Sequence, residues 1–295
     1  MASILITGAF GVLGSELVKK IISEGQHKVI ALVKSTSDPS RLIDKLEQIR
    51  VYHSDKDQLS SIFKNEIQHI IHTATVYGRN LSKADTVKNN VDFPLELIEL
   101  AIKNNVKTFL NSDSYFNKFN MYSYLNEYVV SKNKLEKQLK KYDGIRIFNL
   151  KIEHIYTGND TDRKFVNKII NQIVSRESKI ELTKGNQKRD FIFISDVVDF
   201  YLSIINNANS FEKQFYNFEV GTGNSVSIKD FVLLTMEVFE NNETILEFGA
   251  IPQRKNEIME SKADLSKTPK HLKWTPKIDL RTGLKLIKKE WKNSQ

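Results

Sequence analysis

The chain has 295 residues, of which 40% are hydrophobic and 27% charged, a composition typical of a globular protein with one large core or two joined lobes. It contains no cysteine, which excludes disulfides, thiolate metal sites and a cysteine nucleophile. The six histidines show no spacing typical of metal ligands, and the formal charge of +8 suits a protein that handles anions such as nucleotide diphosphates.

The first half of the chain alternates short apolar runs with amphipathic stretches. The apolar runs predict strands at residues 4–6, 29–33, 49–52, 69–72, 108–110 and 145–148. Helices are predicted directly after the first strand and at residues 58–63, 93–103 and 126–141. Alternation of strand and helix implies right-handed crossovers, so we expect an α/β fold with a doubly wound parallel sheet, the Rossmann fold.

The alternation breaks in the second half of the chain, after about residue 156. Helices are predicted near 164–175 and 196–205, and strands near 215–220 and 245–248. We predict a dinucleotide-binding Rossmann domain of residues 1–155, to which sheet elements return from about 190–222. A smaller substrate-binding lobe is predicted from residues 156–189 and 223–295.

A glycine-rich segment, Gly8-Ala9-Phe10-Gly11-Val12-Leu13-Gly14, lies between the first predicted strand and the helix after it. Glycine permits a tight turn, close approach of a phosphate to the backbone and close helix packing, which is the role of the dinucleotide fingerprint in this context. The spacing differs from the general Gly-x-Gly-x-x-Gly, and a plain turn is the alternative. Cofactor contacts are predicted at Gly8, Phe10, Gly11, Val12 and Gly14.

The end of the second strand bears on the choice of cofactor. It lacks the carboxylate that NAD-preferring sites place there for the ribose 2′-hydroxyl. Lys34 and Ser35, with Arg41 as a further candidate, suit a 2′-phosphate, although Lys34 could be ordinary surface charge. We therefore expect NADPH or NADP, with NADH less favoured. Asp55, after the third strand, could receive the adenine amino group or cap the next helix.

Tyr128 and Lys132 are four residues apart in a predicted helix, which places them on one face. A nearby ammonium stabilises a phenolate and lowers the pKa of the tyrosine, which makes it a better acid–base group. Ser112, after the fifth strand, could hydrogen-bond the same substrate oxygen. Alone, the pair could equally be a partly buried tyrosine with an extended lysine beside it. Together with the glycine loop it indicates a redox enzyme.

The glycine loop, Ser112, Tyr128 and Lys132, in this order, resemble the extended short-chain dehydrogenase/reductases, the NAD-dependent epimerase/dehydratase family. Further segments are similar to motifs of that family at residues 72–74, 89–91, 150–156, 187–197, 220–223 and 272–276. The resemblance covers nearly the whole chain and implies that Ser112, Tyr128 and Lys132 are catalytic.

The resemblance also implies other contacts to the two ligands, and no metal. Cofactor contacts are implied at Thr73, Ala74, Thr75, Asn90, Tyr128, Lys132 and His154, and substrate contacts at Tyr77, Asp113, Ser114, Arg189, Arg254 and Glu257. Arg189 and Arg254 match positions that grip a nucleotide diphosphate, where a guanidinium fork suits phosphate oxygens, with surface charge as the alternative. Asp113 is either a substrate contact or a hydrogen-bonding residue of its loop.

A narrower likeness concerns residues 109–116, 150–156 and 247–259, which resemble enzymes that reduce the 4-keto group of CDP-4-keto-3,6-dideoxy-D-glucose with NADPH. It implies a CDP-linked keto-deoxysugar as substrate and CDP-abequose as product, for lipopolysaccharide O-antigens, with the C4 epimer CDP-paratose left open. Ser112-Asp113-Ser114 stands where dehydratases of the family carry Thr-Asp-Glu, so reduction is favoured over dehydration. A 4-epimerase with tightly bound NAD and a non-catalytic NADP-binding sensor are the alternatives.

The last expectations concern the location of the protein in the cell and its partners. No apolar run approaches the length of a membrane span, and the N-terminal segment lacks the basic region and cleavage site of a signal peptide, so we expect a cytoplasmic protein without membrane contact. The lysines are spread as on solvated helix faces, which disfavours a nucleic-acid partner. By analogy with the family, a homodimer is expected through residues 93–103 and 126–141.

Overall fold

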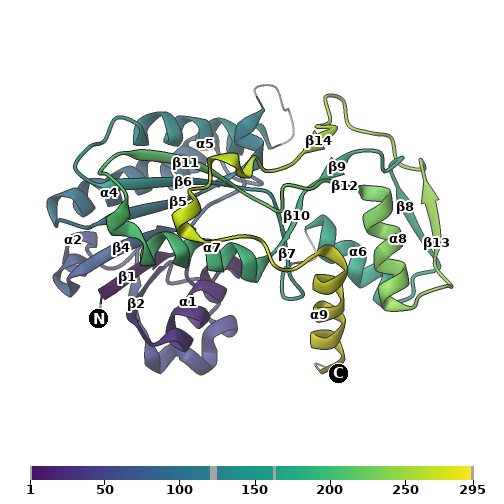
Figure 1. Ribbon diagram of the computed structural model, residues 1–295, viewed down its shortest axis with the longest axis horizontal. Coiled ribbons are helices and arrows are strands. Elements are labelled where there is room, and N and C mark those ends of the chain that lie inside the picture. The colour runs from purple at the N-terminus through teal and green to yellow at the C-terminus, as the bar shows by residue number, and fades with distance from the viewer. Residues whose placement is uncertain (1, 120–124, 162–163, 294–295) are drawn as a thin grey trace. The chain divides into compact units, whose positions relative to one another are not determined.

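The computed structural model describes residues 2–119, 125–161 and 164–293, and the chain divides into two compact units (Figure 1). The first unit comprises residues 1–151, 198–218 and 268–273, and the second comprises residues 152–197, 219–267 and 274–295. The chain thus passes to the second unit a few residues before the predicted boundary at 155. The returning segment, 198–218, is shorter than the predicted 190–222.

The first unit is built on a seven-stranded sheet with the order β11-β6-β5-β4-β1-β2-β3. The strands are β1 Ala2–Thr7, β2 His27–Val33, β3 Arg50–His53, β4 Ile67–His72, β5 Thr108–Ser114, β6 Arg146–Ile152 and β11 Phe215–Val220. The neighbouring pairs from β3 to β5 are parallel, with Ile6 of β1 opposite Ala31 of β2 and Ile71 of β4. The strand order reverses at β1 and β4, and in such sheets ligands bind at the carboxyl edge beside the reversal. The predicted doubly wound Rossmann fold is confirmed.

Helices cover both faces of this sheet (Figure 1). They are α1 Val12–Glu24, α2 Leu59–Ile62, α3 Lys83–Val87, α4 Phe93–Lys103, α5 Asn126–Leu139 and α7 Ile194–Asn206, with 3₁₀ turns at Ser40–Gln48, Phe63–Asn65 and Tyr115–Lys118 and a π-helical turn at Lys88–Asp92. Helices α2, α4 and α5 pack on one face. Helices α1 and α7 lie on the other, joined by an ion pair of 3.4 Å between Lys20 and Asp199.

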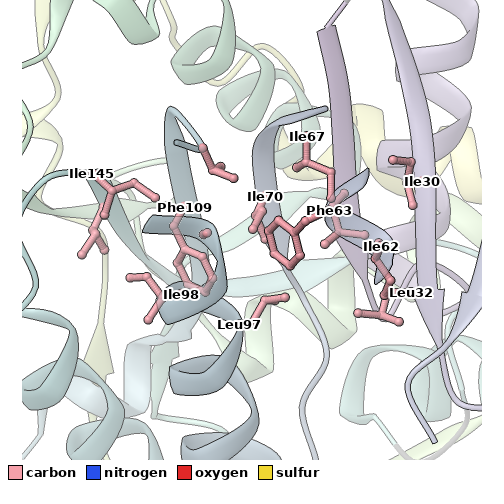
Figure 2. Packing of buried hydrophobic residues seen from close by; sticks show 14 of the residues in the cluster. Ile30, Leu32, Ile62, Phe63, Ile67, Ile70, Leu97, Ile98, Phe109 and Ile145 are labelled. Atoms are coloured by element: carbon pink, nitrogen blue, oxygen red, sulfur yellow. The ribbon is translucent and has the colours of Figure 1, made fainter. Parts of the chain in front are cut away.

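The core of the first unit lies between the sheet and helices α2, α4 and α5 (Figure 2). Leu97 and Ile98 of α4 meet Ile70 and Phe109 of the sheet, and all four are fully buried. The i, i+1 and i+4 apolar positions of α4 and the β-branched residues of the strands produce this interface, because each presents an apolar face to the other. Truncating Phe109 to alanine would cost about 3–5 kcal/mol of stability.

The described residues of the second unit form helices and short strands. The elements are β7 His154–Tyr156, α6 Phe165–Val174, β8 Lys179–Leu182, β9 Lys188–Arg189, β10 Phe191–Phe193, β12 Val226–Ser227, α8 Ile228–Phe239, β13 Ile245–Phe248, β14 Glu260–Ser261 and α9 Leu280–Asn293. The strands pair as β10-β7, β12-β9-β14 and β13-β8. The predicted helix near 164–175 and strand near 245–248 are confirmed, whereas α8 and α9 were not predicted.

Asp190, a fully buried carboxylate, ties separate segments of the second unit together. It accepts hydrogen bonds from the backbone amides of Thr222 (2.8 Å), Gly223 (2.9 Å) and Ala263 (3.1 Å), and from the Thr222 hydroxyl (2.6 Å). A Cβ atom at Gly221 would lie 2.4 Å from this carboxylate, which explains the glycine. Within the described ranges of the chain, no helix is long and apolar enough to cross a membrane.

Candidate functional site

The glycine loop forms the turn between β1 and α1, and two of its glycines are required by geometry. Gly8 has φ +67°, the left-handed region that other residues rarely adopt, and a Cβ atom there would lie 2.9 Å from the backbone of Ala74. At Gly14 a Cβ atom would lie 2.2 Å from the carbonyl oxygen of Gly8. The turn and the first turn of α1 therefore approach each other more closely than any side chain allows.

The start of α1 is open to an anion. Helix α1 begins after Gly11, which has no side chain to cap it, and its first turn carries no acidic residue. Backbone amides and the helix dipole at such an end favour a phosphate group. The loop therefore fits the pyrophosphate of a dinucleotide, the group for which Gly8, Phe10, Gly11, Val12 and Gly14 were predicted.

At the end of β2, the predicted 2′-phosphate residues already contact neighbours. Lys34 is exposed, and its ammonium donates to the side-chain oxygen of Asn89 at 2.8 Å. Ser35 donates from its amide (2.8 Å) and its hydroxyl (2.6 Å) to the two carboxylate oxygens of Asp55. These bonds lower the pKa of Asp55, so the carboxylate is charged at neutral pH. Asp55 follows β3, and its carboxylate lies at the end of β2. This contact with Ser35 was not predicted from the sequence.

The end of β4 is hydrogen-bonded to β1. The hydroxyl of Thr7 lies 2.8 Å from Nδ1 of the buried His72, and it accepts from the amide of Ala74 at 3.2 Å. The hydroxyl of Thr73 donates to the carbonyl of Thr7 at 2.7 Å. These bonds hold the predicted cofactor residues 73–75 against the glycine turn. Burial, with a smaller effect of the Lys132 charge, lowers the pKa of His72 to about 3.

Asn90 joins the loop after β4 to helix α5. Its amide nitrogen donates to the carbonyl of Val76 (2.8 Å) and the hydroxyl of Ser131 (3.0 Å), and its oxygen accepts from the amide of Val76 (2.9 Å) and the hydroxyl of Thr75 (3.2 Å). It lies in a π-helical turn, a feature common at functional sites. Asn90 therefore positions Thr75 and α5, and its predicted cofactor contact stays a prediction.

Tyr128 and Lys132 lie on the inner face of α5 and are 5% and 3% exposed. The Lys132 ammonium is 5.8 Å from the centre of the Tyr128 ring and donates to the carbonyl of Ser112 at 2.8 Å. The ring of Tyr77, the predicted substrate residue after β4, lies 5.0 Å from the ring of Tyr128. The structure thus brings Tyr128, Lys132, Ser112 and Tyr77 together at the carboxyl edge of the sheet.

The pKa of Tyr128 differs from the expectation that Lys132 would lower it. Burial raises this pKa well above its usual value, and the charge on Asp113 and the neighbouring Tyr77 act in the same direction, whereas a hydrogen bond with Ser114 lowers it. Burial also lowers the pKa of Lys132 to about 8. The phenol is therefore protonated at neutral pH.

The serines at the end of β5 have different partners. The hydroxyl of Ser112 lies 2.7 Å from that of Tyr201 on α7, whereas Ser114 bonds to Tyr128. Tyr201 is fully buried, and burial raises its pKa. Tyr201 was not predicted from the sequence, because an aromatic residue within a predicted helix carries no signal beyond packing.

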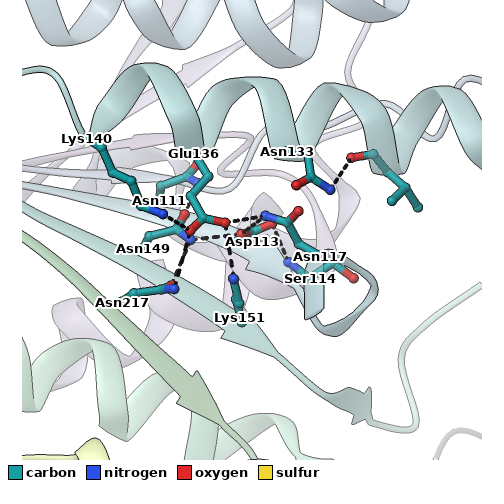
Figure 3. A network of polar contacts seen from close by, with 11 residues as sticks. Asn111, Asp113, Ser114, Asn117, Asn133, Glu136, Lys140, Asn149, Lys151 and Asn217 are labelled. Carbon is teal, nitrogen blue, oxygen red and sulfur yellow. Dashed lines mark hydrogen bonds and ion pairs between the residues drawn. The ribbon is translucent and has the colours of Figure 1, made fainter. Parts of the chain in front are cut away.

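Asp113 lies in a buried polar network between β5, β6 and α5 (Figure 3). It accepts from the amide groups of Asn117 (2.7 Å) and Asn149 (2.8 Å) and from the backbone amide of Ser114 (2.8 Å). This placement agrees with the alternative that Asp113 is a hydrogen-bonding residue of its loop. Its carboxylate already accepts three hydrogen bonds from the protein. The asparagines of the network were also missed, because nothing in the sequence distinguishes them from surface residues.

The predicted diphosphate-binding arginines belong to the second unit. Arg189 is 5% exposed and donates to the carbonyl of Ile258 and the carboxylate of Glu257, both at 2.6 Å. Glu257, a predicted substrate residue, is thus the ion-pair partner of Arg189. Arg254 is exposed. His154 is half-buried, and this burial together with the Arg189 and Lys164 charges lowers its pKa to about 3.

A metal centre has no support in the described part of the chain, where no cluster of histidine and acidic side chains could hold an ion. The features that remain are a Rossmann sheet, a glycine cradle for pyrophosphate and a tyrosine–lysine pair at the carboxyl edge. They define a dinucleotide-binding protein of the short-chain dehydrogenase/reductase type.

Comparison with known proteins gives the family. Residues 4–221 match the model of the NAD dependent epimerase/dehydratase family, and the chain belongs to this family. It is 34% identical to CDP-abequose synthase from Salmonella typhimurium over 296 residues, which cover 97% of each chain. It is 25% identical to a putative UDP-glucose 4-epimerase from Methanocaldococcus jannaschii, over 99% of each chain.

Solved structures agree on the fold. The UDP-glucuronic acid 4-epimerase of Bacillus cereus, in complex with UDP-glucuronic acid and NAD, matches 99% of this chain and 100% of its own with a TM-score of 0.83 and 19% identity. The UDP-glucose 4-epimerase of Thermotoga maritima, in complex with UDP-glucose, matches 99% of this chain and 100% of its own with a TM-score of 0.82 and 23% identity.

Proposed function

We propose that the protein is an NADPH-dependent 4-ketoreductase that converts CDP-4-keto-3,6-dideoxy-D-glucose to CDP-abequose, for the dideoxysugars of O-antigens. The observation that carries the proposal is the 34% identity to CDP-abequose synthase along 97% of both chains. The placement of Tyr128 and Lys132 at the carboxyl edge of the sheet supports reduction chemistry. The first unit would bind the cofactor, and residues of the second unit the nucleotide sugar.

The residues of the first unit have complementary tasks in this reaction. NADPH, when bound, supplies the hydride that adds to C4 of the sugar. Tyr128 donates its phenolic proton to the oxygen of the former carbonyl, so that a hydroxyl group forms and the phenolate remains. Ser112 hydrogen-bonds this oxygen, and Lys132 stabilises the phenolate and holds the nicotinamide ribose. These donors act where negative charge develops.

Burial keeps Tyr128 in the protonated form from which a proton can be donated. A reductase needs this phenol protonated before the reaction, and burial keeps it so at neutral pH. An epimerase must also abstract a proton in its first step, for which a lowered pKa is better. Both reactions use Tyr128, and a raised pKa makes its phenol a weaker acid, so the ammonium of Lys132 must stabilise the phenolate in either case.

Several ligand contacts are part of the proposal. Lys34, Ser35 and Arg41 would hold the 2′-phosphate of NADPH, which requires Ser35 to be shared with Asp55. Arg189 and Arg254 would bind the CDP diphosphate, with Glu257 holding the fork of Arg189 in position. We also expect a cytoplasmic homodimer that pairs through α4 and α5.

The proposal is tested by following the absorbance of NADPH at saturating enzyme with CDP-4-keto-3,6-dideoxy-D-glucose. TDP-4-keto-6-deoxy-D-glucose serves as the comparison substrate, and NADH as the comparison cofactor. We expect rapid oxidation of NADPH with the CDP sugar alone, and the C4 configuration of the product distinguishes CDP-abequose from CDP-paratose.

Other outcomes contradict the proposal in distinct ways. Oxidation of NADPH with the TDP sugar would mean that the protein is a 4-reductase whose substrate carries TDP and not CDP. Interconversion of nucleotide sugars without net oxidation would identify a 4-epimerase. Binding of NADPH without turnover of either sugar would revive a non-catalytic sensor.

A further inference from the structure

Ser112, near the end of β5, is held at two points by residues of different helices. Its main-chain carbonyl accepts a hydrogen bond from the Lys132 ammonium at 2.8 Å. Its hydroxyl lies 2.7 Å from the hydroxyl of Tyr201. Lys132 belongs to α5 and Tyr201 to α7, two helices that cover opposite faces of the sheet, and all three residues lie in the first unit (Figure 1). Ser112 is therefore fixed from both faces of the sheet.

The alternation of side chains along β5 explains why Ser112 meets α7. Phe109 and Asp113 lie on the face that α4 and α5 cover, where Phe109 packs in the core and Asp113 belongs to the polar network (Figure 3). Successive side chains of a strand point to opposite faces, so the hydroxyl of Ser112 points to the face covered by α7. The side-chain partner of this serine must therefore come from α7.

The hydroxyl of Tyr201 lies in apolar surroundings. Tyr201 is fully buried, and its neighbours on α7 are buried and apolar, namely Val197, Val198, Phe200, Leu202, Ile204 and Ile205. A phenylalanine would fill the same space without the cost of burying a hydroxyl. Among the residues that the structure describes, the partner of this hydroxyl is Ser112. The bond to Ser112 therefore explains a tyrosine at this position.

Hydrogen-bond accounting gives the direction of this bond. A tyrosine has an ordinary pKa near 10, and burial raises that of Tyr201, so its phenol carries a proton at neutral pH. If Ser112 donated to Tyr201, this buried proton would have no acceptor, which is costly. Tyr201 therefore donates and Ser112 accepts. The proton of the Ser112 hydroxyl is then available for another acceptor, and Ser112 itself is half-buried.

We propose that Tyr201 is a positioning residue for Ser112: its buried phenol donates to the serine hydroxyl, so that the serine proton is left to bond the substrate oxygen. A hydroxyl that accepts a hydrogen bond is polarised and becomes a stronger donor. The catalytic consequence rests on the proposed function, in which Ser112 bonds the C4 oxygen. The bond between the two hydroxyls does not depend on that function.

The catalytic test is a double-mutant cycle, measured from NADPH oxidation. Tyr201→Phe keeps the ring and removes the donor, so kcat is expected to fall about 3- to 10-fold, with KM for the sugar nearly unchanged. Ser112→Ala is expected to lower kcat about 10²-fold. In the Ser112→Ala background, Tyr201→Phe should have no further effect on kcat, because Tyr201 acts through the serine. An equal loss in both backgrounds, or none in either, would overturn the positioning role.

Tyr216→Phe is the matched control. Tyr216 is a half-buried tyrosine of β11 in the same unit, and its hydroxyl accepts from the side chain of Gln214 at 3.0 Å. The carbonyl of Gln214 accepts from the amide of Ile147, at the beginning of β6, so Tyr216 lies toward the amino end of the sheet. Loss of this hydroxyl should leave kcat and KM at their wild-type values.

The bond itself is tested without cofactor or sugar, in protein labelled with ¹³Cζ-tyrosine. The resonance of Tyr201 is the one absent from Tyr201→Phe. Ser112→Ala should shift this resonance, because the phenol loses its acceptor, whereas Tyr216→Phe should leave it in place. An unchanged resonance in Ser112→Ala would overturn the bond and the positioning role with it. A wild type that reduces neither sugar would refute the proposed function, and the Tyr201 resonance would still decide the bond.

Discussion

Tyr128 is the residue on which the proposed chemistry depends most. Tyr128→Phe keeps the ring and its packing against Tyr77 and Phe116 but removes the proton donor. We expect kcat to fall about 10²–10⁴-fold, with cofactor affinity nearly unchanged. Tyr142→Phe is the matched control, because its hydroxyl contacts Glu99 at the surface of the same unit. Near-normal turnover of Tyr128→Phe, measured from NADPH oxidation, would remove Tyr128 from the mechanism.

Lys132 sets the expected alkaline limit of activity. Burial lowers its pKa to about 8, whereas the pKa of Tyr128 is raised, so Lys132 deprotonates first as the pH rises. Activity that needs the ammonium is therefore full near pH 6–7, falls to half near pH 8 and is lost above it. The measurement is kcat/KM from pH 6 to 10. A decline that begins only near pH 10 would mean that the pKa of Lys132 keeps its ordinary value in the working enzyme.

At the residue scale, the sequence predicted which residues lie at the site better than it predicted the residues that they contact. Tyr128, Lys132 and Ser112 were predicted from their residue types, their spacing and the family resemblance; they lie together at the carboxyl edge of the sheet, and their catalytic roles stay predictions. The bond between Ser35 and Asp55, and that between Ser112 and Tyr201, join residues 20 and 89 positions apart. Such partners depend on strand order and helix placement. The pKa of Tyr128 was predicted in the wrong direction, because burial, which the spacing of two residues does not reveal, raises it.

At the element scale, the turn from β1 to α1 offers a prediction with an internal control. Gly8 and Gly25 have nearly the same φ, +67° and +65°, but a Cβ atom would meet Ala74 at Gly8 and nothing within 4 Å at Gly25. Gly25→Ala should cost about 1 kcal/mol of stability, the cost of the left-handed conformation. Gly8→Ala should cost about 1–3 kcal/mol more, because the backbone must move.

The same pair of variants separates stability from cofactor binding. Gly8→Ala should also weaken binding of NADPH, measured by fluorescence titration, at least about tenfold, because the displaced turn carries the anion-binding amides. Gly25→Ala should bind as the wild type does. Equal effects of the two variants on stability and on binding would show that the close approach at Gly8 has no importance.

Whole helices and strands could be predicted where the hydrophobic periodicity of the sequence was clear. Helix α4 begins and ends at the predicted residues, and the six predicted strands of the first half are all present. Helix α9 was missed although it has a fully buried Leu284, because lysines surround its apolar positions. The two-residue strands of the second unit are too short to show an alternation of apolar and polar residues. They pair with segments distant in the sequence, and Asp190 hydrogen-bonds to residues near two of them.

At the scale of the whole molecule, the buried His69 and His72 and the half-buried His154 make the fold sensitive to acid. Burial lowers the pKa of His69 to about 4 and that of His72 and His154 to about 3. The unfolded chain, with histidine pKa near 6.5, therefore binds more protons between these values than the folded protein does. Stability is fully present above pH 6.5 and falls as the pH decreases, by up to about 2 kcal/mol per histidine at pH 5.

The window between pH 7 and pH 5 isolates these histidines, because unfolded carboxylates titrate mainly below about pH 4.5. Guanidinium unfolding at the two pH values should show the loss. His69→Gln, which can still bond to Thr108, should reduce the loss by up to about 2 kcal/mol. His69 and His72 belong to the first unit and His154 to the second, so acid weakens both units. Equal stability at pH 7 and pH 5 would mean that the rings become protonated without opening the fold.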